Sequence, residues 1–210
     1  MKVVVAKRPA RRIVLWTQRV LFAAAFSLLA YCGFVLADAW LFQKWERRQL
    51  ERLLAGRQDS NAGALQTASS SSAETAPPAV ANGLIGRIEI PRLGLSAMVI
   101  EGISGRTLRR AVGHIPGTAL PGRPGNVGIS GHRDTFFRPL RNIRENDIIT
   151  LTTLFGEYRY RVVSTEVVDP YDVAVLNATG NEVLTLVTCY PFYFVGTAPD
   201  RFIVRAERVT

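Results

Sequence analysis

Residues 185–204 read TLVTCYPFYFVGTAPDRFIV and contain two runs of β-branched and apolar residues separated by a segment with Pro, Gly and Asp. Such runs favour strands, and such separators favour turns. Cys189 ends the first run and Arg201 begins the second. If the two strands are neighbours in one sheet, they present a thiol and a guanidinium on a common surface.

The same strand pattern extends over the rest of residues 83–210. The expected strands are residues 85–91, 95–102, 125–131, 147–154, 157–168, 183–188 and 201–209. Two stretches, 107–112 and 136–143, have the pattern of helices or turns. Seven or eight short strands with little helix predict a mainly β domain, folded as a closed or partly closed β-barrel.

An apolar segment near the N-terminus predicts a membrane anchor. Residues 20–37 carry no charge, and aromatic residues extend the segment to residue 42. Eighteen helical residues span about 27 Å, close to the hydrocarbon thickness of roughly 30 Å. A cleaved signal peptide is the alternative, since Ala37-Asp38-Ala39 resembles a cleavage site. The apolar stretch exceeds the usual 7 to 15 residues of a signal core, which favours an uncleaved anchor.

Most of the positive charge flanks this segment. Residues 1–57 hold eleven Lys and Arg against three acidic residues, and therefore +8 of the chain's net charge of +9. This distribution favours contact with anionic lipid and predicts no nucleic-acid partner. Six basic residues precede the span and five follow it, so charge alone hardly decides the orientation. We expect a single-pass protein of the cell membrane, with a cytoplasmic N-terminus, because the enzymatic interpretation below requires an extracytoplasmic domain.

Five segments follow from these patterns. They are a basic cytoplasmic N-terminus (1–19), the transmembrane signal anchor (20–42), a juxtamembrane helix (43–57), a flexible linker (58–82) and the catalytic domain (83–210). Trp45, Leu50, Leu53 and Leu54 give the juxtamembrane segment a helical apolar spacing. The linker is rich in Ser, Ala, Thr and Pro and has no aromatic residue, so it buries too little surface to offset its ordering entropy.

The two cysteines and two histidines differ in context. Cys32 lies in the apolar span and is expected to be structural. Cys189 is then the only thiol outside the membrane, and such an unpaired cysteine is a candidate for reactivity. His132 follows a Gly-flanked strand, at a strand end of the kind that often holds reacting groups. His114 is expected to be structural.

These residue types match the needs of a cysteine nucleophile. With a free-thiol pKa near 8.5, only about 3 percent of a cysteine is thiolate at pH 7, and a nearby cation raises that fraction. A histidine can return a proton to a leaving amine. An arginine can donate hydrogen bonds to a developing oxyanion. The separation of His132 and Cys189 by fifty-seven residues is a weak pattern by itself.

A resemblance strengthens the hypothesis. TLVTC at residues 185–189 resembles the TLxTC signature of sortases, which are membrane-anchored cysteine transpeptidases, and RFIV at 201–204 looks like the arginine-bearing final strand of that family. IGRIEIPRLGL resembles the family's first strand and GNVGISGHRDTFFRPL its histidine segment, in a form most like class D. The resemblance implies a sortase-type barrel with His132 as acid/base, Cys189 as nucleophile and Arg201 as oxyanion and substrate-positioning residue. It also implies that Thr188 helps to shape the substrate pocket. Tyr190 is an aromatic candidate for the wall of that pocket, and packing of a loop is its alternative role.

The resemblance further implies a reaction and its partners. The substrates are secreted proteins with a C-terminal LPxT-like sorting motif, and the acceptor is an amine such as a peptidoglycan precursor or a pilin lysine. No cofactor or metal is expected, and the loop at residues 169–183 is expected to set substrate choice. Asp134 is a weaker candidate for orienting His132. The alternatives are a non-catalytic membrane-anchored β-barrel that binds an envelope partner, and a papain-like or L,D-transpeptidase enzyme, although the SHGC-type context of the latter is absent.

Overall fold

The computed structural model describes residues 8–63, 83–194 and 196–209, with the side chains of the first range described from residue 12 to 56. The chain forms two compact units, Met1–Leu41 and Phe42–Thr210. Most of the expected linker lies outside the described residues, and its first residues, 58–63, belong to a helix.

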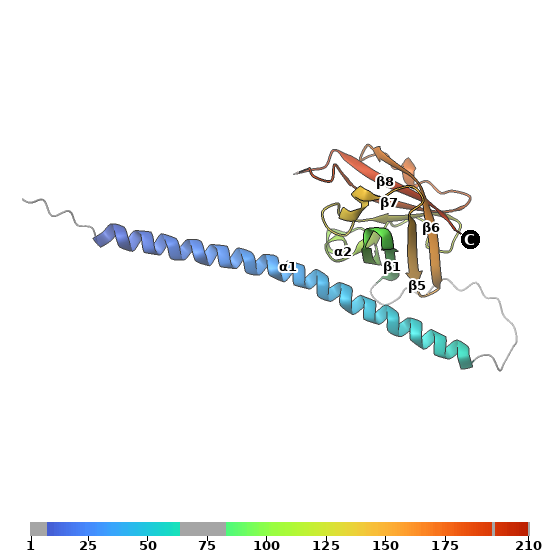
Figure 1. Ribbon diagram of the computed structural model, residues 1–210, viewed down its shortest axis with the longest axis horizontal. Coiled ribbons are helices and arrows are strands. Elements are labelled where there is room, and N and C mark those ends of the chain that lie inside the picture. The colour runs from blue at the N-terminus through green and yellow to red at the C-terminus, as the bar shows by residue number, and fades with distance from the viewer. Residues whose placement is uncertain (1–7, 64–82, 195, 210) are drawn as a thin grey trace, which may run out of the picture. The chain divides into compact units, whose positions relative to one another are not determined.

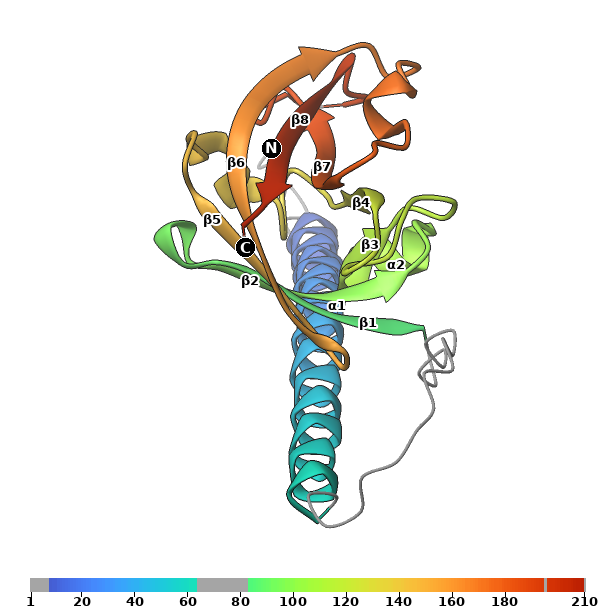
Figure 2. The ribbon, with the colours of Figure 1, turned by 90° about the vertical axis from the view of Figure 1, so that its right-hand side faces the viewer.

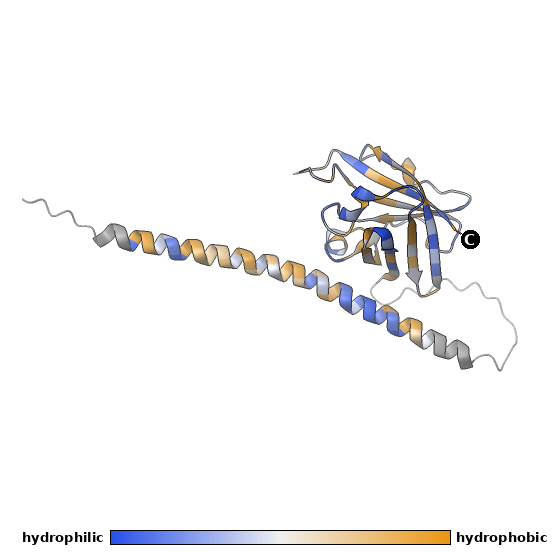
Figure 3. Ribbon diagram, viewed as in Figure 1, coloured by the Kyte–Doolittle hydropathy of each residue, from blue (hydrophilic) through white to orange (hydrophobic). Residues whose placement is uncertain are grey.

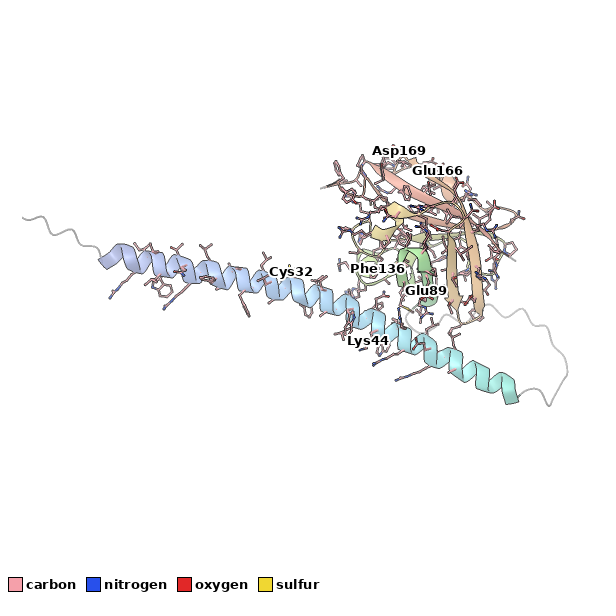
Figure 4. The ribbon with its side chains drawn as sticks, viewed as in Figure 1. Cys32, Lys44, Glu89, Phe136, Glu166 and Asp169 are labelled. Atoms are coloured by element: carbon pink, nitrogen blue, oxygen red, sulfur yellow. The ribbon has the colours of Figure 1, made fainter. Side chains whose placement is uncertain are left out.

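That helix, α1 (Arg8–Gly63), is continuous over 56 residues. Its apolar run and the polar run that follows are visible in Figure 3. Among the described residues it is the helix long and apolar enough to cross a membrane, which makes it a candidate membrane anchor. Cys32 lies on the apolar part of α1 and is exposed there (Figure 4), as expected for a side chain that faces lipid.

Eight strands close into a barrel (Figure 1), which confirms the prediction of a mainly β fold. The barrel order is β1-β2-β3-β4-β7-β8-β6-β5, and Figure 2 shows β7, β8 and β6 side by side. The strands are β1 (Leu84–Ile90), β2 (Leu95–Glu101), β3 (Val112–His114), β4 (Gly125–Ser130), β5 (Ile148–Thr153), β6 (Gly156–Val168), β7 (Glu182–Tyr190) and β8 (Asp200–Arg208).

Strand β3 was not predicted from the sequence. This strand has three residues, parallel to β2 and antiparallel to β4, and such a segment is too short for an alternating pattern. The helical stretch expected at 107–112 ends earlier, as α2 (Gly105–Arg110), with the Ser104 hydroxyl accepting a hydrogen bond from the Thr107 amide at its N-cap. Three other connections contain the short 3₁₀ helices η2 (Pro91–Leu93), η3 (Arg138–Asn142) and η4 (Ala174–Leu176).

The barrel interior is the main hydrophobic core. Alternate residues of each strand point inward, and they form one buried cluster with the side chains of η3 and the turn before it. Tyr160 and Phe137 are its largest fully buried members. The Tyr160 hydroxyl donates a hydrogen bond to Glu182, and burial raises the pKa of Tyr160. The core therefore ties β6 to the start of β7.

A second apolar cluster lies on the outer surface of the barrel, under α1. Leu50 of α1 is 1% exposed and packs with outward-facing side chains of β2, Met98 and Ile100. Gln43 joins the two elements by hydrogen bonds: its Oε1 accepts from the Met98 amide at 2.9 Å, and its Nε2 donates to the Arg110 carbonyl at 2.6 Å. The segment of α1 from Phe42 to Leu54 is therefore packed on the barrel.

The packed face of this segment repeats every four residues, at Phe42, Glu46, Leu50 and Leu54. Glu46 is the exception, because it is 0% exposed and neither carboxylate oxygen has a hydrogen-bond partner among the described residues. Burying an unpaired carboxylate is unfavourable. The face differs from the apolar set expected from the sequence, since Trp45 and Leu53 are exposed.

An ion pair joins two connections at one end of the barrel. The Arg92 guanidinium of η2 hydrogen-bonds the Asp147 carboxylate, which is 6% exposed and also accepts from the Arg144 amide at 2.8 Å. The hydrogen bond from Arg92 lowers the pKa of Asp147. The pair holds η2 against the turn that precedes β5.

We predict that Glu46→Leu stabilises the protein, because leucine completes the apolar face and removes an unpaired buried carboxylate. The expected gain in the free energy of unfolding is about 1 to 3 kcal/mol. Chemical denaturation of the full chain in detergent micelles measures it. The control is Glu51→Leu on the exposed side of the same helix, which should change stability by less than about 0.5 kcal/mol. Equal effects of the two substitutions would contradict the buried position of Glu46.

Stability should also depend on Asp147 at low pH. Because its pKa is lowered in the folded state, the contribution of Asp147 is present above the unfolded value of about 3.9 and is lost as the pH falls through the folded pKa. Below about pH 4 the free energy of unfolding of Asp147→Asn should therefore fall less steeply than that of the parent protein. Glu145→Gln, an exposed change in the same turn, should keep the parent slope. If the free energy of unfolding of Asp147→Asn fell with pH as steeply as that of the parent protein, the ion pair would not be the source of the pH dependence.

Candidate functional site

The site is built on the parallel pairing of β4 with β7. Their register runs from Gly125 opposite Glu182 to Ser130 opposite Val187. Beyond the strand end, the Gly131 amide donates to the Val187 carbonyl at 3.1 Å, and the buried Thr188 hydroxyl donates to the Gly131 carbonyl at 2.7 Å. His132 is the next residue after Gly131. The pairing therefore brings His132 and Cys189 to the same end of two neighbouring strands.

The antiparallel pairing of β7 with β8 adds the arginine. Cys189 lies directly opposite Arg201 in the register. Leu184 and Leu186 point into the core, so the alternation of a strand turns Cys189 to the outer surface. Directly opposed residues share a face, and Arg201 accordingly lies on the same surface. His132, Cys189 and Arg201 are all half-buried.

A tight packing contact sets the turn that carries His132. The His132 carbonyl accepts from the Phe137 amide at 3.1 Å. The Phe137 ring is fully buried and lies so close to Gly131 that a Cβ there would come within 2.7 Å of it. Residue 131 must therefore be glycine for the turn to close on the core.

The Arg201 guanidinium makes its described hydrogen bonds to backbone carbonyls at the start of β8 and in the loop before it. Its Nη1 donates to the Asp200 carbonyl at 3.0 Å and to the Ala198 carbonyl at 3.4 Å. A guanidinium has five N–H donors. Within the described part of the chain, Nε and Nη2 have no hydrogen-bond partner, which leaves them available to an oxyanion.

Thr188 and Tyr190 point away from the Cys189 face. Thr188 is 2% exposed, and its hydroxyl is bonded to Gly131. The Tyr190 ring packs in an aromatic cluster with Phe192, at 6.1 Å between centroids, and with Phe202, at 6.2 Å. These contacts indicate that Thr188 and Tyr190 support the structure around the site. Direct contact of either residue with substrate stays a prediction.

The other two polar candidates have different surroundings. His114 is buried on β3, with Nδ1 2.7 Å from Glu101 Oε2 and Nε2 2.9 Å from the Ala119 carbonyl. Both ring nitrogens are thus engaged in structural contacts. Asp134 is exposed and has no hydrogen bond to His132 among the described residues.

The loop between β6 and β7 borders the outer face of β4. Asn126 Nδ2 donates to the carbonyls of Val175 at 3.0 Å and Asn177 at 3.3 Å, which fixes the loop between β6 and β7. Thr185 of β7 donates to Asn126 Oδ1 at 2.7 Å. Figure 4 shows Glu166 near the end of β6 and Asp169 where this loop begins. The loop expected to set substrate choice is therefore anchored beside the strand pair that carries the site.

Asn126 and Arg133 were not predicted from the sequence. Asn126 is a polar residue in an apolar strand, which is a signal of a buried hydrogen bond. Arg133 follows His132 directly and donates three hydrogen bonds to carbonyls of the loop between β7 and β8. Within the described ranges, no group of three or more His, Cys, Asp or Glu side chains is placed to hold a metal ion.

A family model for the sortase domain matches residues 88–209. The chain belongs to the sortase family. It is 32% identical over 192 residues to sortase D of Bacillus subtilis (strain 168), a match that covers 90% of this chain and 96% of that protein. Sortases are transpeptidases in general, and membership of the family supports a general transpeptidase role for this chain.

Solved structures agree with the fold. The Clostridium perfringens sortase D5 transpeptidase is similar with a TM-score of 0.63 and 25% identity, over 80% of this chain and 99% of that chain. Streptococcus agalactiae sortase C1, solved in complex with MTSET, is similar with a TM-score of 0.59 and 25% identity, over 78% of this chain and 91% of that chain. The resemblance found in the sequence motifs is thereby confirmed.

We predict that Gly131→Ala destabilises the protein by about 1 to 3 kcal/mol, because the new methyl group overlaps the Phe137 ring. The cost should be smaller when Phe137 is replaced by leucine, which leaves room for the methyl group. A double-mutant cycle on the free energy of unfolding measures the coupling. Additive costs would show that the Phe137 ring does not constrain residue 131.

Proposed function

We propose that this sortase cleaves an LPxT-like sorting motif with Cys189 as nucleophile, His132 as acid/base and Arg201 as oxyanion and substrate-positioning residue. The observation that carries the proposal is the direct opposition of Cys189 and Arg201 across β7 and β8, with His132 following the Gly131 amide that bonds to β7. These three groups are the set that acyl transfer through a thiol requires.

The reaction has two acyl-transfer steps. The Cys189 thiolate attacks the carbonyl carbon of the scissile peptide bond, and the free donors of Arg201 stabilise the oxyanion that forms. The C–N bond breaks as His132 gives a proton to the leaving nitrogen, which leaves a thioester on Cys189. An amine then attacks the thioester and loses a proton to His132, and the Cys189 thiolate departs. The product is a new amide.

The supporting residues set the geometry of this reaction. Thr188 acts by holding the Gly131 carbonyl, and hence the turn that carries His132. Tyr190 contributes to the substrate pocket from the aromatic cluster at the barrel end. We assign the acceptor as a cell-envelope amine such as a peptidoglycan precursor or a pilin lysine.

The apolar helix supports a location at the cell membrane. The N-terminal segment 1–19 is cytoplasmic, residues 20–42 cross the membrane, and the catalytic domain 83–210 is extracytoplasmic in this proposal. Secreted substrates and envelope acceptors meet at that surface. Anchoring raises the local concentration of enzyme and both substrates there.

The full chain in detergent, incubated with an LPxT-x peptide and an amine, should yield the transpeptidation product by mass spectrometry. Cys189→Ala should abolish both cleavage and product. Arg201→Lys keeps the charge and loses the planar fork, so kcat/KM should fall about 10² to 10³-fold with the fold intact.

The two histidines provide the matched comparison. His132→Ala should abolish turnover, whereas His114→Ala should mainly lower stability, because His114 is bonded to Glu101 and Ala119. Product formation by Cys189→Ala would contradict the proposed nucleophile. A folded parent protein that neither forms a thioester nor cleaves any sorting-motif peptide would instead support the non-catalytic barrel that binds an envelope partner.

A further inference from the structure

The loop between β7 and β8 is held by an arginine that the reaction does not use. This loop leaves β7 after Cys189 and Tyr190 and enters β8 at Asp200. Arg133 Nη1 donates to the Pro191 carbonyl at 2.9 Å. Its Nη2 donates to the carbonyls of Phe194 at 2.7 Å and Gly196 at 3.1 Å.

Three carbonyls of one loop thus converge on one guanidinium. The planar fork of an arginine suits this arrangement, and a lysine ammonium cannot reproduce its geometry. The guanidinium carbon also lies 5.9 Å from the centroid of the Phe194 ring, within the range of a cation–π contact. Arg141, which lies further along the same connection, is placed 5.5 Å from the Tyr193 ring. The segment after β4 therefore contacts the loop between β7 and β8 at several points.

The other end of the loop touches a proposed catalytic group. The Ala198 and Asp200 carbonyls accept hydrogen bonds from Arg201 Nη1. Arg133 is the neighbour of His132 in the chain. One side chain therefore links the turn that carries the imidazole to the loop that orients the guanidinium.

We propose that Arg133 is a positioning residue that fixes the loop between β7 and β8, and through it the orientation of Arg201 relative to His132. This inference rests on the proposed function, because it assigns Arg133 a place behind two of the proposed catalytic groups. It predicts that loss of Arg133 loosens the loop and slows acyl transfer while the barrel stays folded.

The first test measures the loop without using activity. Tyr193 and Phe194 are 76% and 46% exposed, and limited chymotrypsin cleavage after them reports local opening of the loop. Arg133→Gln and Arg133→Lys in the full chain should raise the cleavage rate at least about tenfold, since one lost charge-assisted hydrogen bond is worth that factor. Arg138→Gln, an exposed arginine in the same connection, should leave the rate unchanged. A parent-like cleavage rate in either Arg133 variant overturns the proposal.

The second test separates positioning from general support. In single-turnover acylation of Cys189 by an LPxT-x peptide, Arg133→Gln should lower the rate about 10 to 100-fold. It should add little further loss when Arg201 is already glutamine, because the two changes act through one loop. Additive losses, or a Tm lowered enough to explain the first result, overturn the positioning role. If the parent protein itself shows no acylation, the proposed function fails, and the cleavage comparison still decides whether Arg133 holds the loop.

Discussion

The parallel pairing of β4 with β7 is the interaction on which the site depends. The segments that carry His132 and Cys189 are far apart in the chain, and six register pairs bring them to one edge. Two further hydrogen bonds, between Gly131 and Val187 and between Gly131 and Thr188, extend the pairing past the strand end. A slip of one residue would turn Cys189 into the core and Thr188 outward. The buried Thr188 hydroxyl and the Asn126–Thr185 hydrogen bond oppose such a slip, because each would leave a polar group without its partner.

Arginines organise the surface around this strand pair. Arg201 lies opposite Cys189, and Arg133 holds the loop that connects β7 with β8. Arg92 fixes a connection elsewhere in the barrel through Asp147. In each case a planar cation bonds carbonyl or carboxylate oxygens that a loop would otherwise leave to solvent. Loops held in this way can present reacting groups in one arrangement, which lowers the entropic cost of reaching the transition state.

Much of the barrel was predictable because its strands are local patterns. Seven of the eight strands overlap segments that were predicted to be strands, and the eighth, β3, is too short to give a pattern. The packing of α1 on β2 was harder to predict, although four consecutive apolar residues, 97–100, indicate a strand buried on both faces. The face of α1 that packs on β2 was not predicted because it contains Glu46, and a charged residue in an apolar stripe usually indicates an exposed position.

The candidate site was also predictable only in part. Cys189, His132 and Arg201 were predicted as site residues from their places at strand ends and from family motifs. The approach of His132 to Cys189 depends on the parallel pairing of β4 with β7, which no local pattern specifies. Arg133 was overlooked for a related reason. Its role depends on carbonyl groups some sixty residues away, and backbone carbonyls carry no sequence signal.

The most direct measurement of this arrangement is a thiol cross-link between residues 132 and 189. In a Cys32→Ala, His132→Cys protein, a short bifunctional reagent such as dibromobimane should join the introduced thiol to Cys189, and peptide mapping by mass spectrometry should recover the linked pair. A Glu157→Cys control places the thiol near the other end of β6, eleven residues before Val168, the partner of Arg201. This control should give no link. A folded protein in which residues 132 and 189 stay unlinked would contradict the shared site.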